Sequence, residues 1–161
     1  MERSVAPARE KSAEELARID RERAGANERL RGRLRRAGGP EEQVRAWVSA
    51  TVALAYDPRL AARTRLFFVG NETLGTEFPV ELERCVRMLL DPLETAIAAG
   101  VDAGVFHTDD PEADAVAIHH LCTGLMSDRL MGTGSMTRER AVALAERFAL
   151  AALKTEDEDE E

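Results

Sequence analysis

Few residues in this sequence could carry out chemistry, and they do not form a recognisable catalytic or metal-binding motif. His119 and His120 are adjacent, so on a helix their side chains diverge by about 100° and cannot both ligate one ion without help from elsewhere. The sequence has no His-x-x-x-His and no Glu-x-x-His pair, the spacings of zinc-protease and di-iron helices. We therefore expect no metal and no cofactor, and an enzyme only if folding places carboxylates around a metal beside these histidines.

Candidate nucleophiles are equally isolated. Cys85 and Cys122 fall in apolar segments without a Cys-x-x-Cys pairing, which predicts reduced thiols in the core rather than a disulfide. No Gly-x-Ser-x-Gly sequence is present, and Gly132-Thr133-Gly134 lacks the Gly-Lys-Ser/Thr that completes a phosphate-binding loop. The residue pattern thus predicts a protein that is not an enzyme.

A different set of side chains would suit a binding pocket. Bulky, soft and weakly polar groups recur on several predicted helices, and a small-molecule site between helices needs a mostly apolar lining with a few polar points. The same residue types also make an ordinary core, so both interpretations stay open for each member. The predicted ligand-binding residues are Trp47, Thr51, Phe67, Phe68, Met88, His119, Cys122 and Met126.

The elements that must position these residues are predicted to be helices. The chain has 161 residues, the size of one domain, and its aromatic content of 4% is low for a β-sandwich or barrel. No segment shows a convincing alternation of β-branched residues, whereas apolar residues recur at the helical period. We predict an all-α bundle of about six helices, at residues 12–37, 40–56, 57–75, 79–100, 111–131 and 137–153.

Proline marks where several of these helices begin. Pro40 and the Asp57-Pro58 and Asp110-Pro111 pairs place proline at a first helical position, in two cases after a capping aspartate. Pro92 lies inside a predicted helix instead, where it removes a backbone donor. We expect a kink between Met88 and Asp91, which would keep two neighbouring helices from packing along their full length.

Charge is unevenly distributed along the chain. The net charge of the chain is -8. Residues 1–65 hold fifteen basic and ten acidic residues, whereas residues 66–161 hold seven basic and twenty acidic residues. In the arginine-rich helix at 12–37, acidic residues alternate with the arginines. This pattern favours a helix surface exposed to solvent over one that contacts the phosphates of a nucleic acid. We predict a disordered segment at 1–11, a folded domain at 12–153 and a disordered acidic tail at 154–161.

Membrane and export signals are missing from the sequence pattern. No apolar run approaches the roughly 20 residues of a membrane span. Met1–Glu10 also lacks the apolar core of a signal peptide. We expect a cytoplasmic protein without a membrane partner.

Small side chains on the last two predicted helices would let helices approach closely, as in a four-helix bundle built by two copies. An intramolecular hairpin could use the same faces, so that alternative stays open. The residues predicted for a homodimer interface are Gly124, Ser127, Ala141, Ala145, Phe148 and Ala152.

One stretch carries a family resemblance. From residue 96 the chain reads AIAAGVDAGVFHTDDPEADAVAIHHLCTGL, in which a helix ending at Gly100 is followed by Gly104, Phe106, the helix-opening Asp110-Pro111 and Gly124. This pattern resembles the C-terminal effector domain of the TetR family of transcriptional regulators. The resemblance spans about residues 12–153 and includes the long helix at 12–37, the Gly-Pro-Glu-Glu at 39–42 and the Asp-Pro helix at 57–75.

The resemblance implies the effector-sensing and dimerisation domain of a transcriptional repressor. It implies a homodimer formed through the helices at 111–131 and 137–153, and a cavity for a small, mostly apolar effector among the helices at 40–56, 57–75, 79–100 and 111–131. The family reads DNA through an N-terminal helix-turn-helix, for which the eleven residues before the first predicted helix are too few. We therefore expect DNA contact only through a module absent from this chain. Two alternatives are a helical structural or protein-interaction dimer without ligand, and a partner that inactivates a full-length relative.

Overall fold

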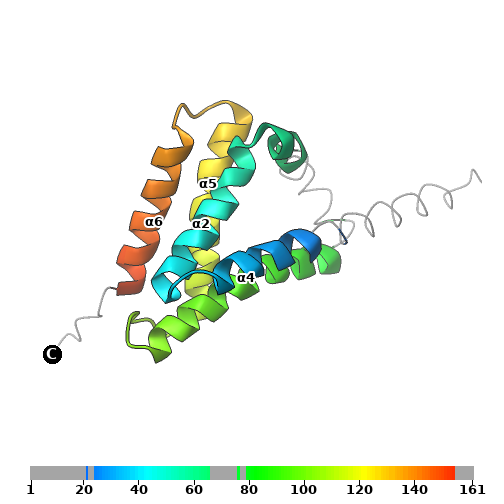
Figure 1. Ribbon diagram of the computed structural model, residues 1–161. Helices are drawn as coiled ribbons and strands as arrows, with labels where there is room; N and C mark the ends of the chain where they lie inside the picture. Colours follow the sequence, from blue (N-terminus) through cyan, green and yellow to red (C-terminus); the bar gives the residue numbers. More distant parts are fainter. Residues whose placement is uncertain (1–20, 22–23, 66–75, 77–78, 155–161) are drawn as a thin grey trace, which may run out of the picture.

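The fold of the described residues is entirely helical. The computed structural model describes residues 21, 24–65, 76 and 79–154, and no strand occurs among them. Four helices are α2 (Pro40–Tyr56), α4 (Pro79–Asp102), α5 (Pro111–Met131) and α6 (Arg138–Lys154), and residues 24–35 and 58–65 are also helical (Figure 1). The predicted all-α fold with about six helices is confirmed.

The predicted helix ends agree closely with the observed ones. Helices α2 and α5 have the predicted bounds, and α4 continues two residues past Gly100. Lys154, which we assigned to the acidic tail, is instead the last residue of α6. The predicted disordered segment 1–11, residues 155–161 of the predicted tail, and parts of the predicted helices 12–37 and 57–75 lie outside the described residues.

Helix α5 shows why the boundaries are readable from sequence. The Asp110 carboxylate accepts a hydrogen bond of 3.0 Å from the Ala113 N–H, which satisfies a donor that the first turn leaves without a helical partner. Pro111 follows at a position that needs no N–H. At the other end Gly132 adopts a left-handed φ of 73°, and its N–H bonds to the last carbonyls of the helix.

Helix α2 is the centre of the bundle. It contacts α4, α5 and α6, and Figure 1 shows it crossing in front of α5 with α6 beside it. Because α2 has a neighbour on several sides, its buried stripe is wide rather than narrow. The residues of α2 that are buried are Val44, Trp47, Val48, Thr51, Val52 and Ala55.

The turn after α4 is held by one close contact. The Phe106 ring is 1% exposed and lies against Gly100, where a Cβ atom would be only 2.0 Å from Phe106 Cδ2. The N–H groups of Val105 and Phe106 both donate to the Gly100 carbonyl, and the His107 N–H donates to the carbonyl of Leu153 near the end of α6. This turn therefore joins the end of α4 to the end of α6.

We predict that Gly100→Ala destabilises the fold by about 1–3 kcal/mol or more, because the new methyl group overlaps a buried ring that has little room to move. Urea unfolding followed by far-UV circular dichroism measures the change. Gly32→Ala is the matched control: its Cβ would meet only the flexible ends of Arg35 and Arg36, and alanine is the better helix former. A Gly100→Ala protein as stable as the Gly32→Ala protein would contradict this packing.

Candidate functional site

Trp47 is the best-fixed residue of the predicted pocket. It is completely buried, and its indole Nε1–H donates a hydrogen bond of 3.1 Å to the Leu89 carbonyl on α4. Leu89 stands one residue after Met88, whose carbonyl lacks its usual helical donor because Pro92 has no N–H. The indole therefore donates to the turn of α4 that the buried Pro92 perturbs.

His119 of α5 lies beside this tryptophan. The two rings are in an edge-to-face arrangement with 6.2 Å between their centroids. His119 is partly buried, and its Nδ1 atom is buried without a hydrogen-bond partner. Burial lowers the pKa of His119 below its ordinary value, and the neighbouring His120 lowers it further. A neutral imidazole therefore presents one unsatisfied polar atom inside the bundle.

The other predicted pocket residues are only partly brought together. Cys122 is fully buried in the same apolar cluster as Trp47, and burial raises the pKa of its thiol to about 12. Thr51 is buried one turn after Trp47, and Met88 is partly buried on the perturbed turn of α4. Met126 packs in a separate small cluster with Ala55 and Leu130. Phe67 and Phe68 lie outside the described residues.

One hollow formed by described residues lies elsewhere on the molecule. It is an open depression of about 340 Å³ between α2 and α6, on the outside of the bundle. Charged and small side chains line it, and none of the predicted ligand-binding residues does. Its lining residues are Ser49, Arg138, Glu139, Val142, Ala143 and Glu146.

The residues predicted for a dimer interface divide between the interior and the surface. Ala141 and Ala145 are fully buried in the core of the subunit, so in this fold they pack intramolecularly and do not form an exposed interface. Their small size lets α6 approach the rest of the bundle. Phe148 is 55% exposed, Gly124 and Ala152 are exposed, and Ser127 is partly exposed.

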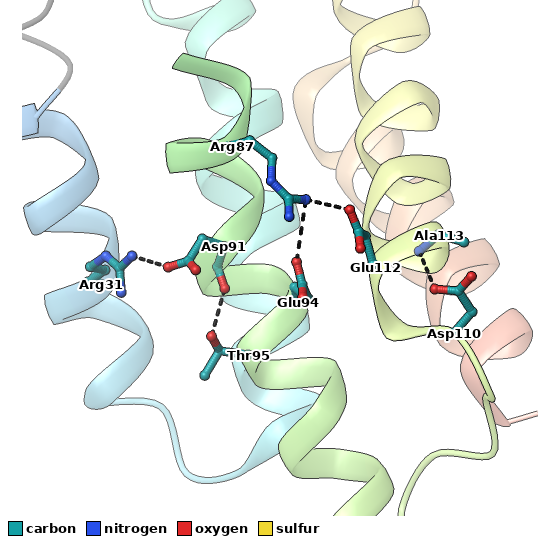
Figure 2. Close-up of polar contacts among 8 residues, drawn as sticks. All are labelled: Arg31, Arg87, Asp91, Glu94, Thr95, Asp110, Glu112 and Ala113. Carbon is teal, nitrogen blue, oxygen red and sulfur yellow. Dashed lines mark hydrogen bonds and ion pairs between the residues drawn. The ribbon is translucent and has the colours of Figure 1, made fainter. Parts of the chain in front are cut away.

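Ion pairs on the surface connect neighbouring helices. Figure 2 shows Arg31 of the helix at 24–35 paired with Asp91 of α4, and Arg87 of α4 bridging Glu94 and, at 2.7 Å, Glu112 of α5. Since these groups are largely exposed, each pair contributes at most about 1 kcal/mol. The helix at 24–35 is therefore held mainly by its apolar face, in which Leu34 is 5% exposed and Leu30 packs against the core.

Comparison with known proteins gives no relative for this chain. No family model, no curated protein and no solved structure matches it. Within the described ranges, no helix is long and apolar enough to cross a membrane. Among the same residues, no group of three or more histidine, cysteine, aspartate or glutamate side chains is placed to hold a metal ion.

Sequence reasoning missed two polar contacts of this region. The acceptor for the Trp47 indole is the main-chain carbonyl of Leu89, which residue type does not reveal. Pro92 signals only that the same turn of α4 is perturbed, at the neighbouring Met88 carbonyl. Tyr56 was also overlooked: its hydroxyl donates to the Met136 carbonyl, and the Arg129 guanidinium lies 5.2 Å above its ring. These contacts join α2 to α5 and to the loop before α6.

We predict that Trp47→Phe destabilises the protein less in a Pro92→Ala background than in the natural sequence. The N–H of alanine at 92 would bond the Met88 carbonyl, and loss of the proline ring would let this turn straighten so that the Leu93 N–H serves the Leu89 carbonyl, which then depends less on the indole donor. A double-mutant cycle in urea, followed by circular dichroism, measures the coupling. Equal costs of Trp47→Phe in both backgrounds, to within about 0.5 kcal/mol, would show that the indole does not compensate for the proline.

We predict that stability falls as the pH decreases from 7.5 to 5.5, and that His119 accounts for part of this loss. The folded pKa of His119 is depressed, so its contribution is complete above the unfolded value of about 6.5 and is lost as the pH falls toward the folded pKa. Urea unfolding at both pH values tests this. His119→Phe should reduce the pH dependence, whereas His120→Gln, at an exposed position, should retain most of it. Identical pH dependence in the natural protein and His119→Phe would contradict the assignment.

Proposed function

We propose that this chain is a small-molecule-sensing and dimerisation domain of the kind found in TetR-type repressors, acting without catalysis in the cytoplasm. The proposal joins the resemblance at residues 96–125 to the all-helical bundle. Its effector is a small, mostly apolar molecule with one hydrogen-bonding group. DNA contact would require a helix-turn-helix module in addition to this bundle.

The observation that carries the proposal is the buried, unpartnered Nδ1 atom of His119 beside Trp47. A buried polar atom without a partner costs about 1–3 kcal/mol, so a bound molecule that supplied the missing hydrogen bond would recover part of that cost. The surroundings are apolar, with Cys122 and Trp47 fully buried in one cluster. The expected ligand is thus neutral and apolar, with a single hydrogen-bond donor directed at the Nδ1 atom of the imidazole.

The exposed side of the last two helices supports the dimer. Phe148 of α6 is a large apolar side chain that the subunit leaves 55% exposed, and Gly124 of α5 is exposed with open space around it. A small residue on one helix and a ring on the other would suit an isologous helix-to-helix contact. Ala141 and Ala145 take no part in this version of the interface.

We predict that a subset of hydrophobic metabolites and drugs raises the thermal unfolding midpoint, because a ligand that binds only the folded state stabilises it. Each compound is tested beside an analogue in which its N–H or O–H is methylated. The shift should be larger for the donor-bearing compound, and His119→Phe should abolish that difference by removing the polar atom while keeping a ring of similar size.

His120→Gln serves as the control, because His120 is exposed and its replacement leaves Nδ1 of His119 in place. Sedimentation equilibrium on the same samples reports the oligomeric state, and Phe148→Glu should shift a dimer toward monomer. A monomeric protein that no compound stabilises would overturn the proposal. A dimer that no compound stabilises would favour the structural module without ligand.

A further inference from the structure

The helix at 24–35 and the turn after it carry an exposed row of arginines, which we call the arginine stripe: Arg29, Arg33 and Arg36. Their spacings of four and three residues place them on one side of a helix, within about 60° of arc and over about 10 Å. All three are exposed, and none of them has a carboxylate partner within the part of the chain that the structure describes. Their neighbours Arg31 and Arg35 are paired with Asp91 and Glu28.

The stripe is not neutralised by its own helix. Glu28 is the one acidic residue between residues 24 and 40, and it bonds to Arg35 at 2.9 Å. Like charges at these spacings destabilise a helix by a few tenths of a kcal/mol per pair, so an anionic partner along the row would stabilise it. The stripe therefore suits an extended acidic segment or another polyanion.

The end of α6 lies at the same end of the bundle as this stripe. The Lys154 ammonium group pairs with the carboxylate of Glu41, in the first turn of α2. Glu41 also pairs with Arg45, which bonds to Glu146 of α6 at 2.9 Å, so several charges hold these two helix ends together. Only five positions separate Glu41 from Arg36, and Figure 1 shows the chain arriving at α2 beside the end of α6.

The sequence after Lys154 has the complementary charge. Thr155 is followed by six consecutive acidic residues at 156–161. Seven residues span up to about 25 Å when extended, while the five residues from Glu41 back to Arg36 span at most about 18 Å. Extended, the acidic residues therefore have the length needed to run from the end of α6 to Arg36, the near end of the stripe.

We propose that the acidic segment 156–161 docks along the arginine stripe of the same chain. The contact is electrostatic and reversible, and it shields the stripe from other polyanions, such as the phosphate backbone of nucleic acids. It also gives the chain a reason to carry a basic surface within a net charge of -8. The contact is independent of whether the core binds an effector.

The first test observes the contact directly in the full chain. In the test variant all six acidic residues at 156–161 are replaced by glutamine or asparagine. Nuclear magnetic resonance of the arginine Nε–H groups should show shifts at Arg29, Arg33 and Arg36 between the natural protein and this variant, and the difference should vanish in 0.5 M NaCl. Shifts confined to residues outside 24–41 would overturn the proposal. So would a difference that grows with protein concentration, because the segment would then occupy another copy.

The second test uses a fluorescein-labelled 20-nucleotide single-stranded DNA as a generic polyanion in 50 mM NaCl. The variant with all six acidic residues at 156–161 replaced, called the neutralised variant, should bind this probe about tenfold more tightly than the natural protein, because its arginine stripe is uncovered. Adding Arg29→Gln, Arg33→Gln and Arg36→Gln should remove the gain. The control adds Arg59→Gln, Arg138→Gln and Arg140→Gln instead, which changes net charge equally at exposed positions away from the stripe.

The comparison of the two triple variants decides the outcome. A gain that survives in the control and is lost without the stripe supports docking of the acidic segment. Equal losses in both triple variants would mean that net charge alone governs binding, which overturns the proposal. Equally tight binding of DNA by the natural protein and the neutralised variant would also overturn it.

Discussion

The hydrogen bond from the buried Trp47 indole to the Leu89 carbonyl links core packing to the main chain at the centre of this bundle. It joins the central helix α2 to α4 at the turn where Pro92 leaves the backbone short of a donor. The indole supplies an apolar body for the core and a donor for the main chain in one side chain. A smaller or purely apolar residue at position 47 could fill the space, but the Leu89 carbonyl would then lose the hydrogen bond from the indole.

The same tryptophan determines the surroundings of His119. An imidazole against an aromatic edge, with an apolar cluster behind it, is desolvated without gaining a hydrogen bond at Nδ1. Such an arrangement costs stability when nothing is bound. Under the proposed function, recognition would be concentrated in one atom, because the neighbouring Cys122 has a thiol whose pKa is raised to about 12 and which stays protonated. Discrimination between ligands would therefore rest on a single polar contact and on shape.

Much of the fold could be predicted because local rules agree with the tertiary structure. Pro40, Asp110-Pro111 and Gly132 act within one turn of themselves, so α2 and α5 were bounded correctly from sequence alone. The faces of α6 were harder to predict. The small side chains of Ala141 and Ala145 allow another helix to approach closely, but their size does not specify which helix that is. In the structure both residues face the core of their own subunit. Phe148, by contrast, is exposed although its residue type is typical of a core.

The grouping of the predicted pocket residues could be predicted only in part, for a similar reason. Helical periodicity places Trp47, Cys122 and His119 on inward sides of their helices, but it carries no information on which of them meet. The separation of Met126 into its own cluster follows from where α5 passes the end of α2. The Trp47 acceptor is a main-chain atom, which no side-chain pattern encodes.

The central place of α2 also constrains the order in which the chain can fold during synthesis. One flank of α2 is covered by α6, whose first residue, Arg138, follows Tyr56 by more than eighty positions. On a ribosome that adds about 5–20 residues per second, α2 emerges seconds before the helix that completes its burial. During that interval the side of α2 that faces α6 is uncovered, whereas α4 and α5, which emerge earlier, can already pack against its other sides.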